Sequence, residues 1–300
     1  MTDAEVRVAL PVNAELGEGL HWDARRQLLW MVDIHGQRLI QWDLQSSGWL
    51  EWPLPHRIGW VIHCADSDAL LLGLQPGIAR AILGAPGTEP SLSWITRPFG
   101  DNTALRLNDA KADVTGAIWC GSMNNDDPSH GEGCLFRLGP DGQLSVHDSG
   151  YNVANGPAIS PDGRTLLHTD SGRRLIHAFD LDAQAGSVSN KRVWKQFRDD
   201  EGYPDGMTFD AAGRLWVAHW GPGCVSCFTA YGELVLRVQL PAPLITNVCF
   251  AAALGHRLFV SSARVGMKDG AQAQFPHAGC LFEIVVPGIV GAPGLPCFHR

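Results

Sequence analysis

One sequence pattern returns along this chain and constrains its fold more than any other feature. A polar residue precedes a short alternating strand, an Asp, Pro or Gly turn follows, and a second strand, a Gly turn and a third strand come after it. The copies begin at residues 18, 60, 108, 155, 205 and 247, and the copy at Trp60 is degraded. Successive starts are therefore 42, 48, 47, 50 and 42 residues apart. A quasi-period of this size indicates a repeat architecture.

The repeats predict an all-β fold. Helical periodicity is absent, and turn signals recur about every 8 to 12 residues, as in sandwiches and propellers. A unit of about 40 to 50 residues with four strands is the size of a propeller blade. Six units predict a six-bladed β-propeller that occupies residues 1–300 as a single domain. In the fifth unit, Met207 and Phe209 alternate as core residues.

A propeller must join its first and last blades, because open sheet edges invite unwanted pairing. Strand-like segments lie near both ends of the chain, EVRVALP at residues 5–11 and GCLFEIVVP at residues 279–287. We expect the N-terminal strand to complete the blade of the C-terminal segment. Two polar, Gly-rich segments, 124–133 and 264–279, are predicted to be loops over one face.

Charge and hydropathy exclude several classes of partner. The net charge is −8, and no Lys/Arg-rich run offsets it, so we expect no nucleic-acid partner. The chain has no basic start followed by an apolar run and no apolar run of about 18 residues, which argues against a secretion signal and a membrane span. We expect a cytoplasmic protein, as a monomer or weak homo-oligomer.

The cysteines do not form a recognisable metal or disulfide pattern. Eight are scattered along the chain, and only Cys224 and Cys227 form a C-x-x-C, within a segment that alternates like a strand. A zinc or redox site is the alternative for this pair, but packing is favoured because no second pair follows. No H-E-x-x-H is present. His219 and Trp220, at the end of a predicted strand, are interpreted as packing residues rather than catalytic ones.

The register of the repeats predicts a metal site. The innermost strand of each blade runs beside the axis, so the first positions of the repeats should converge there. These positions hold Glu18, Asn108, Asn155, Asp205 and Asn247. Carboxylates brought together repel one another, and a divalent cation among carboxylate and amide oxygens neutralises them. Such ligands suit Ca²⁺, Mg²⁺ or Mn²⁺, with Zn²⁺ and Fe(II) as alternatives. The competing interpretation is that the Asn-Gly and Asp-Gly pairs are ordinary turns.

Several long motifs in order resemble the senescence-marker-protein (regucalcin)/gluconolactonase family of sugar-lactone lactonases. They are LGEGLHW from residue 16, RLNDAKADVTGAIWCGSM from 106, NG at 155, YPDGMTFDAAGRLWVAHWGPGCV from 203 and ITNVCFAAALGHRLFVSSA from 245. The resemblance implies a six-bladed propeller that binds one divalent metal through Glu18, Asn155 and Asp205. It also implies substrate contacts at Arg106 and Asn108, for which an ordinary structural arginine is the alternative at Arg106.

One position departs from the family pattern. The family often places a carboxylate or polar contact after its GTM motif, which here reads GSMNNDD, so Asn125 or Asp126 are the candidates. This departure concerns the identity of the substrate rather than the metal.

The chemistry of these residues favours metal-assisted hydrolysis of a lactone to its aldonic acid. A lactone needs a polarised carbonyl and a nucleophilic water, and a divalent cation with open positions supplies both. The family resemblance suggests that Asp205 is the general base as well as a metal ligand. No G-x-S-x-G motif marks a covalent nucleophile. The alternatives are a metal-dependent phosphotriesterase and a non-catalytic, calcium-binding or regulatory propeller.

Overall fold

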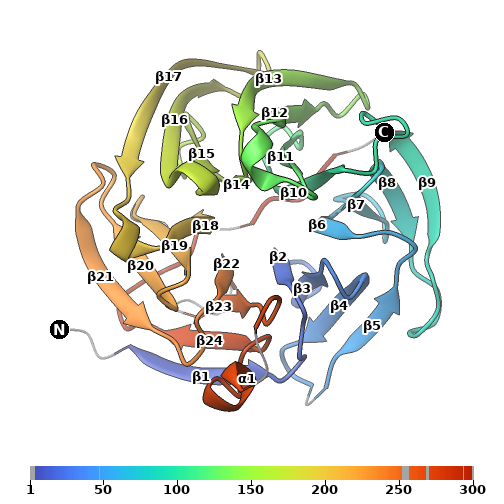
Figure 1. The fold of residues 1–300 in the computed structure, drawn as a ribbon. Coiled ribbons are helices and arrows are strands. Elements are labelled where there is room, and N and C mark those ends of the chain that lie inside the picture. The colour runs from blue at the N-terminus through green and yellow to red at the C-terminus, as the bar shows by residue number, and fades with distance from the viewer. Residues whose placement is uncertain (1–3, 47, 252–256, 268–269, 293, 299–300) are drawn as a thin grey trace.

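The chain folds into six four-stranded antiparallel sheets arranged as blades around a central axis (Figure 1). The structure, a computed structural model, describes residues 4–46, 48–251, 257–267, 270–292 and 294–298. The prediction of a six-bladed β-propeller is confirmed. In each blade the innermost strand comes first in the chain, and the sixth blade takes its outermost strand from the N-terminus.

Blades 1 to 3 are formed by twelve consecutive strands. Blade 1 comprises β2 (Gly17–Asp23), β3 (Leu28–Asp33), β4 (Arg38–Asp43) and β5 (Leu50–Pro53). Blade 2 comprises β6 (Ile58–His63), β7 (Leu70–Leu74), β8 (Gly77–Ile82) and β9 (Ser91–Thr96). Blade 3 comprises β10 (Leu105–Ala112), β11 (Ile118–Asn124), β12 (Gly133–Leu138) and β13 (Leu144–Tyr151).

Blades 4 to 6 complete the ring. Blade 4 comprises β14 (Ala154–Ile159), β15 (Thr165–Asp170), β16 (Leu175–Asp182) and β17 (Ser187–Gln196). Blade 5 comprises β18 (Tyr203–Phe209), β19 (Leu215–Trp220), β20 (Cys224–Phe228) and β21 (Leu234–Gln239). Blade 6 comprises β22 (Ile245–Phe250), β23 (Arg257–Ser262), β24 (Leu281–Val285) and β1 (Glu5–Leu10). The short helices are η1 (Pro128–His130), η2 (Ser171–Arg173), η3 (Asp199–Glu201) and α1 (Ala271–Gln274).

The ring is closed by pairing of the two terminal strands, as predicted. β1 runs antiparallel to β24, with Glu5 opposite Val285 and Leu10 opposite Leu281. The two strands lie together at the rim of blade 6, next to α1 (Figure 1). Since the outer edge of blade 6 comes from the opposite end of the chain, unfolding of either terminal strand opens this blade.

The core lies between neighbouring blades. Six apolar clusters are present, one at each blade interface, and large aromatic side chains mark several of them, such as Trp22 with Phe259 and Trp216 with Phe250. Met207 is fully buried and Phe209 is 6% exposed, which confirms the predicted core alternation in β18. The alternating pattern thus packs both faces of each blade and leaves only the ends of the inner strands free for other side chains.

All eight cysteines are free, and Cys224 and Cys227 are buried within β20. None of the helices in the described part of the chain has the length and apolar character needed to cross a bilayer.

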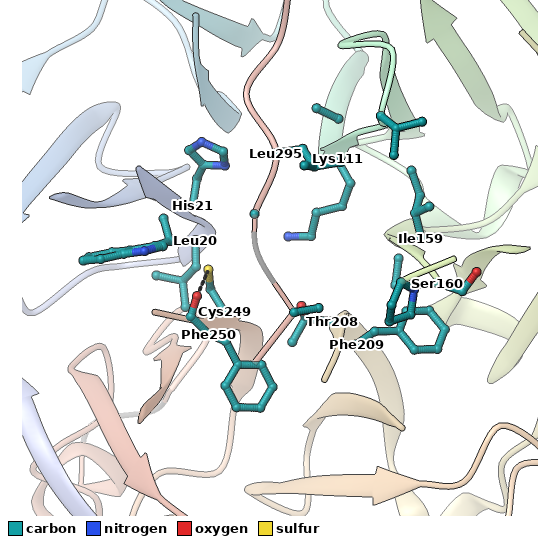
Figure 2. A pocket seen from close by; sticks show the side chains of 17 residues that line it. Leu20, His21, Lys111, Ile159, Ser160, Thr208, Phe209, Cys249, Phe250 and Leu295 are labelled. Atoms are coloured by element: carbon teal, nitrogen blue, oxygen red, sulfur yellow. Dashed lines mark hydrogen bonds between the residues drawn. The ribbon is translucent and has the colours of Figure 1, made fainter. Parts of the chain in front are cut away.

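A C-terminal segment crosses one end of the central channel. Val290 O accepts from Ala211 N of blade 5 at 2.8 Å, and farther along the chain Cys297 N donates to His63 O of blade 2 at 3.0 Å. Figure 2 shows the part of this segment that carries Leu295 running between the side chains of His21 and Lys111. It closes the channel at the ends of the inner strands, where a cavity of about 170 Å³ remains.

Candidate metal and substrate site

The starts of the inner strands are irregular in every blade, and this irregularity builds the site. The register shifts between Glu18 and His21, Ile58 and Trp60, Leu107 and Ala110, Asn155 and Ala158, Pro204 and Met207, and Ile245 and Val248. Bulges re-aim side chains that strict alternation would send to opposite faces. In β10 the consecutive residues Asn108 and Asp109 lie within the interval of the register shift, and both are buried, at 5% and 1% exposure.

Glycines allow these bulges to pack closely at the axis. Gly19 has φ of +56°, a conformation that residues with a Cβ rarely adopt, and an added Cβ would lie 2.8 Å from the carbonyl oxygen of Gly59 in blade 2. At Gly206 an added Cβ would lie 2.5 Å from the side-chain nitrogen Nδ2 of Asn247. The Gly that follows Glu18 or Asp205 is therefore required by the approach of the neighbouring strand.

A cavity of about 440 Å³ opens at this end of the channel. The predicted site residues that line it are Glu18, Arg106, Asn108, Asn125, Asn155 and Asp205. Four blades contribute these side chains, since the residues lie in or next to β2, β10, β11, β14 and β18. Side chains far apart in the sequence are thereby brought to one chamber.

Buried carboxyl groups dominate the electrostatics. Burial, followed by the charge of Glu18, raises the pKa of Asp205 well above its usual value. Burial and the charge of Asp109 raise the pKa of Glu18, and burial also raises the pKa of Asp109. The charged form of all three groups has lost water, and in Glu18 and Asp205 it also faces another acid. A cation at this position would relieve both penalties.

Two carboxylate oxygens at the cavity are available to a cation. Asp205 Oδ1 is buried and has no hydrogen-bond partner within the described residues. Glu18 Oε2 accepts from Gly19 N at 3.0 Å, which leaves Oε1 as the free oxygen of that carboxylate. An orphaned buried oxygen is costly unless something fills its valence, and oxygen donors of this kind fit a hard divalent cation.

Carboxylates alone do not complete a metal site. Across the described ranges there is no group of three or more His, Cys, Asp or Glu side chains with a geometry suited to a metal. Glu18 and Asp205 supply two acidic ligands, so the amide oxygen of Asn155 would have to supply the third. The residues present fit the predicted set of two carboxylates and one amide.

A chain of hydrogen bonds connects Asn155 to the predicted substrate contacts. Asn108 Nδ2 donates to Asn155 Oδ1 at 2.7 Å, and Arg106 Nη1 donates to Asn108 Oδ1. Arg106 Nε donates to Asn125 Oδ1 at 3.0 Å. Burial lowers the pKa of Arg106 to about 10, so the guanidinium is still charged at neutral pH. The arginine is held from two sides and presents a fixed donor to the cavity.

Asn247 corrects one detail of the predicted ring. It is fully buried but does not line the cavity. Its Nδ2 donates to Glu18 Oε2 at 2.9 Å and to Asp109 Oδ2 at 3.0 Å. The bulge in β22 turns this amide towards the neighbouring acids instead of the cavity. Asn247 therefore bridges two carboxylates and holds the orientation of Glu18.

Asp126 is also placed differently from Asn125. Its side chain is exposed and is not part of the cavity wall, because the turn after β11 directs it to solvent. Asp126 N donates to Asn124 Oδ1 at 2.9 Å, which fixes that turn. Of the two candidates after the GSM motif, the structure brings only Asn125 to the cavity.

Several cavity residues were missed by the sequence analysis. The additional lining residues include Leu16, Ile34, His35, Met123, Val153, Ser171, Tyr203 and Trp220. Trp220, which the sequence predicts to be a packing residue, forms part of the cavity wall. His219 is indeed a packing residue, fully buried with its ring centre 5.4 Å from that of Phe197. Met123 and Trp220 lie near the ends of second strands, Tyr203 begins β18, and the other five lie in connections or in η2, so no common register identifies them.

Comparison with known proteins gives one family. Residues 16–264 match the SMP-30/Gluconolactonase/LRE-like region. Regucalcin of Danio rerio is 30% identical over 302 residues, with 98% of each chain covered. L-arabinolactonase of Azospirillum brasilense is 33% identical over 277 residues, covering 89% of this chain and 87% of that protein. A crystal structure of regucalcin from Agrobacterium tumefaciens, described as a calcium-binding protein, has a TM-score of 0.89 at 25% identity and covers 99% of this chain and 97% of that one.

Proposed function

Since the chain belongs to the SMP-30/Gluconolactonase/LRE-like family, we propose that it hydrolyses a sugar lactone to the aldonic acid with one bound divalent cation. The observation that carries this proposal is that the buried side chains of Glu18, Asn155 and Asp205 line one cavity. Within the described residues, Asp205 Oδ1 has no hydrogen-bond partner. A relative named L-arabinolactonase supports the reaction class.

Glu18, Asn155 and Asp205 would hold the cation. When bound, it supplies a Lewis acid for the lactone carbonyl and lowers the pKa of water. The all-oxygen ligand set favours Ca²⁺, Mg²⁺ or Mn²⁺ over Zn²⁺ or Fe(II), and a calcium-binding relative of the same fold supports calcium as one occupant.

Asp205 is proposed to move the proton. With Oδ1, which has no hydrogen-bond partner in the described structure, turned to the cation, the second oxygen of the carboxylate would accept a proton from the water that attacks the lactone carbonyl carbon. As the bond between that carbon and the ring oxygen breaks, the same proton passes to the ring oxygen, which becomes the hydroxyl of the aldonic acid. Burial excludes bulk water from competing for Asp205.

Arg106, Asn108 and Asn125 are proposed to orient the sugar. Arg106 Nη2 has no acceptor among the described residues, whereas Nε and Nη1 are engaged by protein groups. A hydroxyl on the substrate would satisfy it. The apolar faces of residues such as Met123 and Trp220, which line the same cavity, would pack against the C–H face of the sugar ring.

The proposal is tested with chelated protein reloaded separately with Ca²⁺, Mg²⁺, Mn²⁺, Zn²⁺ or Fe(II). A pH-indicator assay follows acid release from glucono-, galactono-, xylono- and arabinonolactone, and a phosphotriester serves as the competing substrate class. We expect lactone hydrolysis that is lost on chelation and restored by at least one cation. Full activity after chelation would exclude the metal. Stoichiometric metal binding without turnover of any lactone would instead indicate a binding or regulatory propeller.

Three further properties are part of the same proposal. We propose that residues 1–300 act as one domain, that the protein is a monomer or weak homo-oligomer, and that it acts in the cytoplasm. A single cooperative unfolding transition checks the first property, sedimentation velocity the second, and cell fractionation the third.

A further inference from the structure

One serine hydroxyl connects the two strands that carry Asn155 and Asp205. Ser171 is the first residue of η2, directly after β15, and is 7% exposed. Its Oγ accepts from Asn155 Nδ2 at 3.0 Å and donates to the carbonyl oxygen of Pro204 at 2.6 Å. Pro204 directly precedes Asp205, so a single side chain contacts the surroundings of two proposed metal ligands from neighbouring blades.

The direction of these hydrogen bonds determines which atom of Asn155 faces the cation. A hydroxyl has one proton, and in Ser171 it points to Pro204, so the hydroxyl can only accept from Asn155. The amide nitrogen is thereby held on Ser171, and Asn155 Oδ1 remains turned towards Asn108 Nδ2. Only the amide oxygen can bind a hard cation. A flipped amide would present N–H groups to it.

The contact with Pro204 lies where β18 leaves its regular pairing. The register of β18 with β19 shifts between Pro204 and Met207, and Asp205 lies within that interval. Because the hydrogen-bond ladder between β18 and β19 is interrupted here, it does not hold the backbone of Asp205 in place. The Ser171 hydroxyl replaces the missing constraint with a hydrogen bond from blade 4.

Ser171 is itself held in place. Its backbone nitrogen donates to Val153 O at 2.9 Å. The preceding residue, Asp170, is 1% exposed and accepts from Arg173 Nη1 at 3.2 Å and from Asn152 N at 3.3 Å. The hydroxyl therefore projects from a constrained turn, as a residue that orients ligands requires.

We infer that Ser171 is a positioning residue that fixes the metal-facing oxygen of Asn155 and the backbone of Asp205 together. This inference rests on the proposed metal site. Ser171 should therefore raise the affinity for the metal. Without its hydroxyl, Asn155 and Asp205 would have to be ordered when the cation binds, which lowers the affinity.

The test compares Ser171→Ala with the matched control Ser226→Ala. Ser226 is a fully buried serine of β20, and its Oγ accepts from Arg237 Nε at 3.1 Å, away from the cavity. Mn²⁺ is titrated into each chelated protein by calorimetry, and circular dichroism checks the fold. We expect Ser171→Ala to weaken Mn²⁺ binding by about 10- to 100-fold, as loss of an orienting partner does elsewhere. Ser226→Ala should change it less than about threefold.

Two further variants separate positioning from general packing. Ser171→Thr keeps the hydroxyl and should recover most of the Mn²⁺ affinity. In an Asn155→Ala background, Ser171→Ala should weaken binding by a smaller factor than in the wild type, because residues that act through each other are not additive. If Ser171→Ala does not fold, Ser171→Cys takes its place, since a thiol is only a weak donor and acceptor.

The outcomes distinguish this inference from the proposed function. If the wild type binds no Mn²⁺, the metal site fails and the inference falls with it. If the wild type binds Mn²⁺ and Ser171→Ala binds it within twofold as tightly, only the positioning role is overturned. Equal weakening by Ser171→Ala and Ser226→Ala would also overturn it, because loss of any buried hydroxyl would then suffice.

Discussion

The two ends of the central channel are built from the same six inner strands but differ in chemistry. At the strand starts, the buried acids Glu18, Asp109 and Asp205 lie around the cavity end. At the strand ends, the channel is lined by apolar side chains such as Leu20, Ile159 and Phe250, with His21 and Lys111 among them (Figure 2). In β18, only three residues separate Asp205 from Phe209.

This difference shows how a repeat fold separates stability from chemistry. The strand ends pack against each other and against the C-terminal segment, which joins blades 5 and 2. The strand starts bulge and leave charged groups without water, and buried charges are costly unless something neutralises them. The strand starts are therefore the end expected to have a function, because packing alone would favour apolar residues there over buried charges.

The largest expected effect comes from removing a carboxylate at the strand starts. Asp205→Ala should reduce kcat/KM for the best lactone by at least about 10³-fold, because the variant loses a metal ligand and the proposed general base. Metal content, measured by elemental analysis, should fall as well. Circular dichroism should show an unchanged fold.

A residue at the other end of the same strand provides the control. Thr208 lines the far cavity, and Thr208→Ala should keep metal content and kcat/KM within about twofold of the wild type, as surface-like substitutions away from a site do. A large loss of metal in Thr208→Ala, or its retention in Asp205→Ala, would contradict the division between the two ends.

The second prediction concerns a core residue at the far end of the channel, where we expect a loss of stability rather than a loss of metal. Phe250 is buried at the far end, and its ring centre lies 5.7 Å from that of Trp216. Phe250→Ala should lower the free energy of unfolding by about 3 to 5 kcal/mol, because it removes a large core side chain. Urea denaturation measures this change. Mn²⁺ affinity of the folded variant should stay near the wild-type value, and a loss comparable to that of Asp205→Ala would show that the two ends are coupled.

Much of the fold was predictable because its information is local. Alternation within strands and turn residues between them recur six times, so errors in one copy, such as the degraded copy at Trp60, are corrected by the others. Closure by β1 and β24 also followed from two strand-like segments near the ends. A repeat fold turns weak local signals into a strong global one.

The register of the repeats predicts the proposed metal ligands, and the family motifs predict the substrate contacts Arg106 and Asn125. Glu18, Asn155 and Asp205 share one repeat position, and the structure brings them to one cavity. Asp109 was missed because strict alternation would point its side chain to the other face of the strand from Asn108. The bulge between Leu107 and Ala110 interrupts this alternation. Bulges have no simple residue signature, so the sequence contained no signal for this acid.

Contacts between blades were beyond sequence reasoning for a different reason. Ser171 meets Asn155 and Pro204 only because two neighbouring blades pack at a given height and angle. Asp126 was a candidate on sequence proximity to the GSM motif, yet the turn after β11 points it to solvent. Such choices depend on a few ångströms of backbone position, which a residue pattern does not encode.

The third prediction examines the cavity beside the acids. Arg106→Ala should lower kcat/KM for a sugar lactone by about 10- to 100-fold, which corresponds to the loss of about 1.5 to 3 kcal/mol for a hydrogen bond to a charged group. Metal content should not change, since Arg106 is not a ligand. Arg106→Lys keeps the charge but not the planar fork that holds Asn108 and Asn125, so it should restore little activity. An unchanged kcat/KM in Arg106→Ala would remove this residue from the substrate site.

The smallest expected effect is a pH dependence from the far end. Burial lowers the pKa of His21 well below the usual value for histidine, and the nearby charges of His63 and Lys111 act in the same direction. His21 is therefore neutral in the folded protein, whereas the unfolded chain takes up a proton near pH 6.5. The stability that His21 contributes is present above that pH and is lost as the pH falls through it.

His21→Gln should consequently make the unfolding free energy less sensitive to acid. The slope between pH 6.5 and 5 should decrease by up to about 1.4 kcal/mol per pH unit, the value for one proton. Gln can still donate to His63 Nδ1, which lies 2.7 Å from His21 Nε2 in the wild type, so packing is conserved. Urea denaturation at several pH values measures the slope, with the exposed His277→Gln as the control. An unchanged slope would mean that His21 is protonated in the folded state, and the far end would then carry a buried charge of its own.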